Sequence, residues 1–133
     1  NFFSEEECSD LLVQANRAGF SSITWEFCPN YRKCNRVLMY SEKFAQLLWK
    51  RLIPMLTIDD LQVKPYGIDT DGLWIPSGIN PCIRFSLYNP TGHFQRHRDG
   101  GFVINDEFRS IFTAMVYLND NFEGGKTKLF LPE

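Results

Sequence analysis

Residues 83–88 alternate between apolar and polar side chains, a pattern that predicts a β-strand with one buried face. A turn sequence at residues 89–92 follows, and His97 and Asp99 lie just beyond it. If the chain is extended there, both side chains project to the same side, because the side chains of a strand alternate faces with a period of two. The sequence therefore predicts one imidazole and one carboxylate side by side.

His97 and Asp99 can offer one nitrogen and one oxygen to a single metal ion. They would supply two of the three ligands of the two-histidine-one-carboxylate triad, which leaves positions open on a non-haem Fe(II). No third ligand follows, since the only histidines of the chain are His93 and His97. Four residues of strand span roughly 13 Å, so His93 is too far along the strand to share an ion with His97. Short motifs also arise by chance, and the alternative is that the pair is an ordinary polar strand face.

Further motifs surround the pair in a definite order. The set resembles the prolyl 4-hydroxylase group of 2-oxoglutarate- and Fe(II)-dependent dioxygenases. Its members are Tyr88, Gly92, Phe94, His97, Asp99, Arg109, Thr113, Tyr117, Leu118, Asn119, Gly124, Gly125, Thr127 and Phe130. Residues 1–8 also look like the helix that opens the catalytic domain of this family.

The resemblance implies a hydroxylase that uses Fe(II), 2-oxoglutarate and O2, together with ascorbate. The implied reaction inserts one oxygen atom into a C–H bond of a prolyl or other residue in a peptide or protein, and converts 2-oxoglutarate to succinate. His97 and Asp99 would be the catalytic metal ligands. The second histidine of the triad, and the Lys or Arg that pairs with the far carboxylate of 2-oxoglutarate, are expected beyond Glu133.

Five further residues are expected to bind 2-oxoglutarate. By resemblance, Tyr88 and Tyr117 hold this co-substrate through their phenols. Met115 shares a strand face with Tyr117, and Thr127 and Leu129 share a face on the next expected strand, so these three would line the pocket. The alternative for both tyrosines is an ordinary core position with a satisfied hydroxyl.

Residues 61–81 are rich in glycine, proline and aspartate, which predicts an irregular loop and hairpin region. Loops of this length inside a domain are often binding loops. Tyr66 and Trp74 are therefore candidates for contacting a substrate, although local anchoring of the loop is an equal alternative. Arg96 is expected to be a surface or substrate-side charge, and Arg109 a member of a structural ion pair.

Two helices are expected before this loop. Ser4 and Glu7 form a capping-box sequence that predicts a helix start, and Gly19 is its expected end. A second helix is expected from Ser41 to Pro54. Their predicted buried stripes are Cys8, Leu11, Leu12 and Ala15 in the first helix, and Phe44, Leu47, Leu48 and Leu52 in the second.

These elements predict a single α+β domain over residues 1–133, built on a double-stranded β-helix (jelly roll). Supporting helices would occupy about residues 1–60, the loop region 61–81, and the jelly-roll strands 82–133. The strands include a buried one at 111–118 and an alternating one at 126–131. The barrel is expected to be truncated at its C-terminal end.

Charge and cysteine content limit the partners. A net charge of −2 gives no electrostatic footprint for nucleic acid or an anionic membrane, and no stretch approaches the ~20 apolar residues of a membrane span. The four cysteines lack zinc-ligand spacing. Reduced thiols in the cytoplasm or nucleus are expected, while a Cys28–Cys34 disulfide and a secretory location stay open.

A non-enzymatic function is the competing prediction. A jelly-roll module that keeps His97 and Asp99 without the rest of the metal triad would bind a partner and not catalyse a reaction. The resemblance favours the enzyme.

Overall fold

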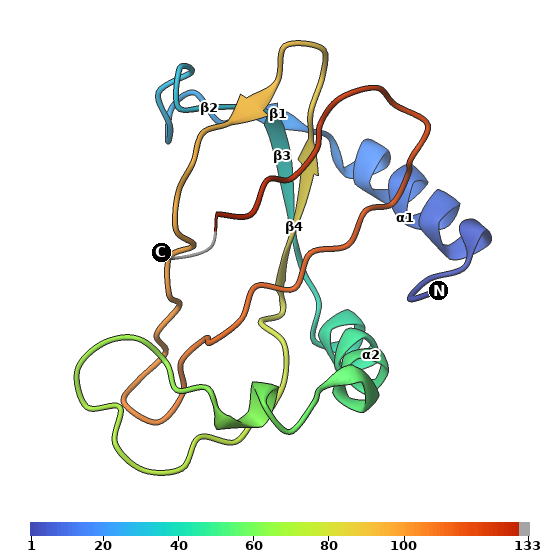
Figure 1. Ribbon diagram of the computed structural model, residues 1–133. Helices are drawn as coiled ribbons and strands as arrows, with labels where there is room; N and C mark the ends of the chain where they lie inside the picture. Colours follow the sequence, from blue (N-terminus) through green and yellow to red (C-terminus); the bar gives the residue numbers. More distant parts are fainter. Residues whose placement is uncertain (131–133) are drawn as a thin grey trace. The chain divides into compact units, whose positions relative to one another are not determined.

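The structure is a computed structural model that describes residues 1–130. It is a mixed α+β arrangement of two helices and two small antiparallel sheets among these residues (Figure 1). The elements are α1 (Glu5–Ala18), β1 (Ser21–Ser22), β2 (Arg32–Lys33), β3 (Asn35–Tyr40), α2 (Glu42–Leu52), the 3₁₀-helices η1 (Ile53–Met55) and η2 (Asp60–Gln62), β4 (Cys82–Leu87) and β5 (His93–Phe94). The α+β class predicted from the sequence is confirmed.

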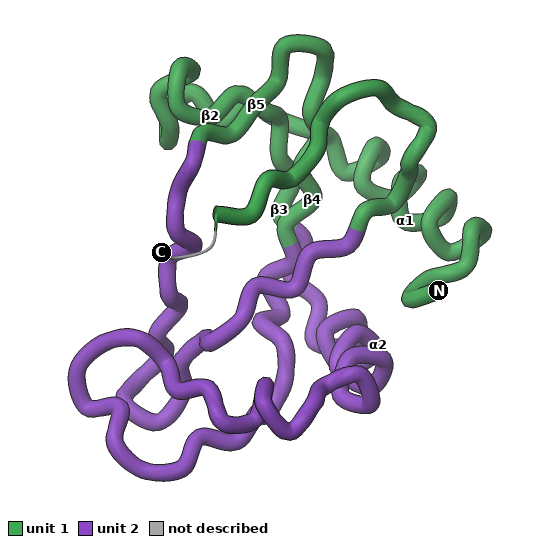
Figure 2. The backbone as a smooth tube through the Cα atoms, viewed as in Figure 1, with its two compact units in different colours: residues 1–38, 84–95, 117–133 green, residues 39–83, 96–116 purple. Residues whose placement is uncertain are grey.

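The chain divides into two compact units, coloured separately in Figure 2. Unit 1 comprises residues 1–38, 84–95 and the chain from 117 onward, and unit 2 comprises residues 39–83 and 96–116. Each unit has its own buried side chains, which are Phe3, Leu11, Ala15, Ile23 and Cys34 in unit 1 and Ala45 and Leu48 in unit 2.

Helix α1 begins and ends where the sequence predicts. The Ser4 hydroxyl accepts a hydrogen bond from the Glu7 amide at 3.1 Å, and the Glu7 carboxylate accepts one from the Ser4 amide at 2.8 Å, which completes the capping box. Gly19 ends the helix with φ of +86°, a left-handed conformation that suits glycine. Leu11 and Ala15 are buried, so the predicted stripe faces inward.

Helix α2 follows the prediction at its ends and departs from it on one face. The Ser41 hydroxyl caps the helix by accepting from the Phe44 amide at 3.1 Å, and Pro54 lies in η1 immediately after it. Leu48 is buried, whereas Leu47 is 40% exposed and Ala45 takes the buried position. The prediction was wrong at Leu47 because the buried face is centred one position away from the largest apolar residues.

The sheets join segments that are distant in sequence. One has the order β1-β3-β4, with Ser21 opposite Arg36, and the other pairs β2 with β5, with Arg32 opposite Phe94. Strand β4 follows the predicted alternation from Ile83 to Ser86, whereas Leu87, predicted on the buried face, is exposed.

The predicted turn between β4 and β5 is present and tightly packed. The Gly92 amide donates to the Asn89 carbonyl at 2.7 Å. A Cβ atom on Gly92 would lie 2.8 Å from the Asn89 carbonyl oxygen and 3.0 Å from that of Lys33. Only glycine fits there without movement of the backbone.

The strands predicted downstream of β5 are the main correction. Residues 95–99, 111–118 and 126–130 form no strand; residue 131 lies outside the described part. From residue 95 to 130, the structure shows only an isolated antiparallel bridge between Val103 and Arg109. Apart from half-buried Ile111 and Leu118, residues 111–118 are exposed, so they are not buried between two layers. An extended segment becomes a strand only where a neighbour completes its hydrogen bonds, and the described part of the chain supplies no such neighbour.

The loop prediction is confirmed in part, and the disulfide that the sequence left open is not formed. Residues 63–81 are irregular, as predicted, but contain no hairpin strands. All four cysteines are free thiols and Cys34 is buried, so the Cys28–Cys34 disulfide is not formed. Among the described helices, none combines the length and the apolar character needed to cross a membrane.

Candidate metal centre

The structure brings His97 and Asp99 together. The His97 Nε2 atom lies 3.1 Å from the Asp99 Oδ1 atom, with 27% and 56% of the two side chains exposed. Both residues belong to unit 2 and lie outside regular secondary structure. Their side chains therefore converge as the i, i+2 spacing predicts, although the segment is not a ladder-bonded strand.

The donor atoms fit two adjacent positions around one metal ion. Metal bonds of about 2.1 Å that meet at a right angle place their donor atoms about 3.0 Å apart, close to the observed separation. Imidazole and carboxylate suit Fe(II), Mn(II) and Zn(II) alike. No group of three His, Cys, Asp or Glu side chains within residues 1–130 could hold an ion. The pair thus provides a partial metal site, and the same contact also serves as an ordinary hydrogen bond.

His93 is held away from such a role by backbone contacts. Its Nδ1 atom lies 3.1 Å from the Thr91 carbonyl oxygen and its Nε2 atom 3.2 Å from the Asn30 carbonyl oxygen. Both ring nitrogens are therefore engaged by the turn and by the chain before β2. His97, by contrast, lies beside the Asp99 carboxylate.

Tyr117 and Thr127 are joined by a hydrogen bond between their hydroxyl groups, within unit 1. Both were predicted to contact 2-oxoglutarate, and both are exposed. Leu129 and Met115 are also exposed, so neither lines an enclosed pocket. The structure brings the two hydroxyl groups together and leaves the predicted apolar walls open.

Tyr88 lies just after β4, and 45% of the residue is exposed. Burial raises the pKa of its phenol, the Cys34 thiol adds to the increase, and the Arg32 guanidinium opposes it. The phenol is therefore protonated at neutral pH and can donate a hydrogen bond to an anion.

The predicted substrate residues have different surroundings. The Trp74 indole nitrogen donates to the Thr70 carbonyl at 3.0 Å, which anchors the loop locally. Tyr66 is fully exposed, and Arg96 is exposed as well. Of the three, Trp74 has the clearest structural role.

Arg109 holds the same loop from a distant part of the sequence. Its guanidinium donates to the Ile68 carbonyl, lies 3.6 Å from the Asp106 carboxylate and sits 5.7 Å from the centre of the Trp74 ring. The expected ion pair of Arg109 is thus present, with Asp106. The contacts of Arg109 with Ile68 and Trp74 hold residues 68–74 within unit 2.

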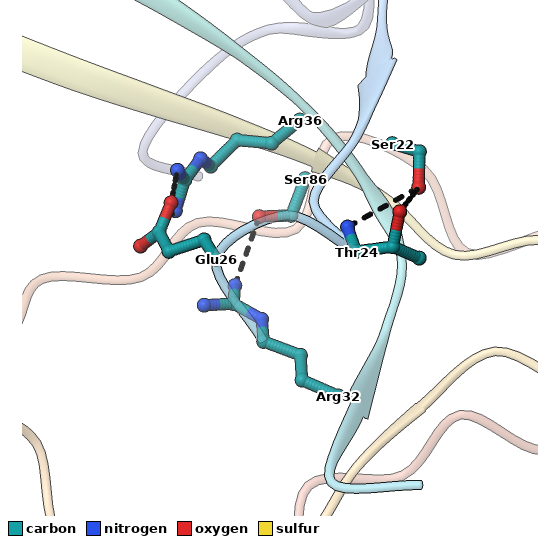
Figure 3. Close-up of polar contacts among 6 residues, drawn as sticks. All are labelled: Ser22, Thr24, Glu26, Arg32, Arg36 and Ser86. Carbon is teal, nitrogen blue, oxygen red and sulfur yellow. Dashed lines mark hydrogen bonds and ion pairs between the residues drawn. The ribbon is translucent and has the colours of Figure 1, made fainter. Parts of the chain in front are cut away.

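Arg32 is a functional candidate that sequence reasoning missed. Its guanidinium donates to the Ser86 hydroxyl at 3.5 Å, whereas the neighbouring Arg36 is paired with Glu26 (Figure 3). No local pattern marks Arg32, because its neighbours come from β4 and β5, far along the chain. Two arginines four residues apart were the available signal, and they do not reveal which one lacks a carboxylate.

Comparisons with protein-family models, curated proteins and solved structures gave no significant match. The functional argument therefore rests on the residues of this chain and their geometry.

Proposed function

We propose that the protein is an Fe(II)- and 2-oxoglutarate-dependent dioxygenase of the prolyl 4-hydroxylase type, built on a jelly-roll domain. The observation that carries the proposal is the 3.1 Å separation between His97 Nε2 and Asp99 Oδ1. The ordered motifs from Tyr88 to Phe130 that resemble this family support it.

In this proposal His97 and Asp99 hold the iron through a neutral imidazole and a carboxylate. The bound iron would bring together 2-oxoglutarate and O2 for decarboxylation of the co-substrate and hydroxylation of a C–H bond. The phenols of Tyr88 and Tyr117 and the hydroxyl of Thr127 would orient 2-oxoglutarate by donating hydrogen bonds to its carboxylates. Ascorbate would keep the iron reduced.

The substrate class proposed is a peptide or protein with a prolyl residue. Tyr66 is fully exposed on the 61–81 loop, so its ring is accessible to a partner chain. Trp74 and Arg109 would hold that loop in position. The free thiols support a reducing compartment such as the cytoplasm or nucleus.

A binding module without catalysis is the second candidate. The exposure of Met115 and Leu129 favours it, because a dioxygenase binds its co-substrate in a pocket that excludes water.

The test is succinate formation from 2-oxoglutarate by the full-length protein with Fe(II) and ascorbate. We expect turnover in the wild type and in His93→Gln, because both ring nitrogens of His93 contact backbone carbonyls. Loss of turnover in His97→Ala, with turnover retained in His93→Gln, would support the enzymatic function. Equal turnover in wild type and His97→Ala would remove the pair from the site, and metal binding with no turnover on any peptide would favour the binding module.

A further inference from the structure

The Arg32 guanidinium is held rigidly by two aromatic rings of unit 1. Its central carbon lies 4.2 Å from the centre of the Phe94 ring and 5.3 Å from that of Phe27. The pairing of β2 with β5 places Arg32 opposite Phe94, so the backbone fixes this stacking. Tyr31 supports the Phe94 ring edge-on, with centroids 5.5 Å apart. Such a cation needs little further ordering to bind a planar anion.

The positive charge of Arg32 is not neutralised by the described residues. Its side-chain hydrogen bonds go to the neutral hydroxyls of Ser86 and Tyr88, and its Nε atom is buried without a hydrogen-bond partner among residues 1–130. Glu26 interacts with Arg32 electrostatically, but its carboxylate accepts hydrogen bonds from Arg36. A buried N–H group without an acceptor is costly. A charge-assisted hydrogen bond from the guanidinium to an anionic ligand would gain binding free energy.

Arg109 shows what a satisfied guanidinium looks like in this chain. Its Nε is also buried and unpartnered, yet it donates to the Ile68 carbonyl and has the Asp106 carboxylate 3.6 Å away. Arg109 therefore has a carbonyl and a carboxylate as acceptors within its own unit, whereas the described acceptors of Arg32 are neutral hydroxyl oxygens. The difference singles out Arg32 as the guanidinium that is prepared for an external anion.

We propose that Arg32, together with the hydroxyls of Ser86 and Tyr88, binds a carboxylate group of a ligand. The fork of a guanidinium matches the two oxygens of a carboxylate, and the two hydroxyls can donate to the same oxygens. A single carboxylate balances the single unpaired charge, whereas a phosphate monoester carries about −1.5 to −2 and calls for a second cation. Two neighbouring cations are engaged elsewhere, since Arg36 pairs with Glu26 and the Lys33 ammonium donates to the Thr91 hydroxyl at 2.9 Å.

This inference concerns side chains of unit 1 and does not depend on the metal pair. The carboxylate has two possible sources, a free dicarboxylate or a glutamate side chain of a peptide. A free dicarboxylate and a glutamate side chain are distinguished by separate probes in the binding experiment.

The experiment is a calorimetric titration of the full-length protein, made metal-free with EDTA and then dialysed into buffer without EDTA, because EDTA itself carries carboxylates. The probes are 2-oxoglutarate, inorganic phosphate, and an acetylated, amidated Ala-Ala-Glu-Ala-Ala peptide beside its Gln counterpart. Binding of 2-oxoglutarate or of the Glu peptide would identify the source. We expect Arg32→Gln to lower the affinity of that probe at least tenfold and Arg32→Lys to lower it about threefold. Arg84→Gln, which removes an exposed arginine of β4, should stay within twofold.

Several results would overturn the proposal. These are wild-type protein that binds none of the carboxylate probes, phosphate bound as tightly as they are, or unchanged affinity in both Arg32 variants. If Arg32→Gln does not fold, the Nε–H resonance of Arg32 in the wild type decides, because it must move on addition of the bound probe. Because EDTA removes metal, failure here leaves the proposed function to its own test.

Discussion

Residues 82–94 and 111–130 are both predicted from the sequence to contain strands, and their structures differ. The first region forms β4, a tight turn and β5, and each strand has a hydrogen-bonded neighbour. The second contains no strand in its described residues, and most of its side chains are exposed. Alternation thus specifies which side chains can share a face, while a partner strand decides whether the face is built.

The two regions also differ in the contacts that hold their residues in place. In the paired region, backbone hydrogen bonds and the Gly92 turn fix the chain. From residue 95 onward, the candidate site residues meet through side chains, as His97 meets Asp99 and Tyr117 meets Thr127. Substitutions in the first region should therefore change stability, and those in the second should change ligand binding.

The largest expected effect is on metal binding. Asp99→Ala should lower the affinity for Mn(II) at least ~100-fold, because a carboxylate ligand is lost. Its free energy of unfolding without metal should stay within ~0.5 kcal/mol of wild type, since Asp99 is exposed and outside any strand. Thermal unfolding with and without Mn(II) measures both, because a ligand that binds the folded state raises its melting temperature. A large loss of unfolding free energy in metal-free Asp99→Ala would contradict the predicted difference between the two regions.

Gly92→Ala should produce the opposite result. The new methyl group would meet two carbonyl oxygens at 2.8 and 3.0 Å, so we expect about 2 kcal/mol of destabilisation with metal affinity unchanged. Gly101→Ala is the control from the chain between the two regions, because its Cβ would meet nothing within 4 Å. It should be neutral or stabilising by up to ~1 kcal/mol. Urea denaturation compares the two, and equal costs would contradict the account.

Tyr117→Phe tests the hydrogen-bonded hydroxyl groups of Tyr117 and Thr127, which lie in the region without strands. Loss of one hydrogen bond to 2-oxoglutarate should raise the apparent KM for this co-substrate about fivefold, which corresponds to ~1 kcal/mol. Tyr31→Phe is the matched control, since its ring packs against Phe94 and its hydroxyl has no assigned role. The expectation fails if both variants retain the wild-type KM.

The smallest effect concerns the ion pair between Glu26 and Arg36 in unit 1. The hydrogen bond from Arg36 lowers the pKa of Glu26 below its ordinary value of 4.5. The stabilisation is therefore complete above that value and is lost as the pH falls through the lower, folded pKa. Glu26→Gln should cost less than about 1 kcal/mol at pH 7, and the difference from wild type should vanish in acid.

Asp106→Asn is the control for this pair. Its carboxylate is 95% exposed and 3.6 Å from Arg109, so we expect no measurable change in unfolding free energy. Denaturation at a series of pH values measures both variants. A Glu26→Gln cost that grows as the pH falls would refute the ion-pair interpretation.

Local signals in the sequence were sufficient for part of this fold. The capping residues Ser4, Glu7 and Ser41 and the Asn89–Gly92 turn act over three or four residues, and each was predicted correctly. Leu47 was misplaced because helical periodicity does not say which neighbours a helix has. The strand predictions at 111–118 and 126–130 were wrong for a related reason, because strand formation depends on a partner strand that the local sequence pattern does not reveal.

The candidate site divides in the same way. The i, i+2 spacing of His97 and Asp99 is local, and the structure brings their side chains within 3.1 Å. Arg32 escaped prediction because Phe94 and Ser86, which surround it, are distant in sequence. Residue types suggested the chemistry, and tertiary contacts were needed to find the guanidinium without a carboxylate.

The most direct test of the central claim is Mn(II) binding to the full-length protein, measured by electron paramagnetic resonance. Wild type, His97→Ala and His93→Gln should be compared at equal concentration. If His97 and Asp99 form the metal centre, wild type and His93→Gln bind Mn(II) alike and His97→Ala leaves the ion free in solution. Equal binding by His97→Ala and wild type would contradict the account.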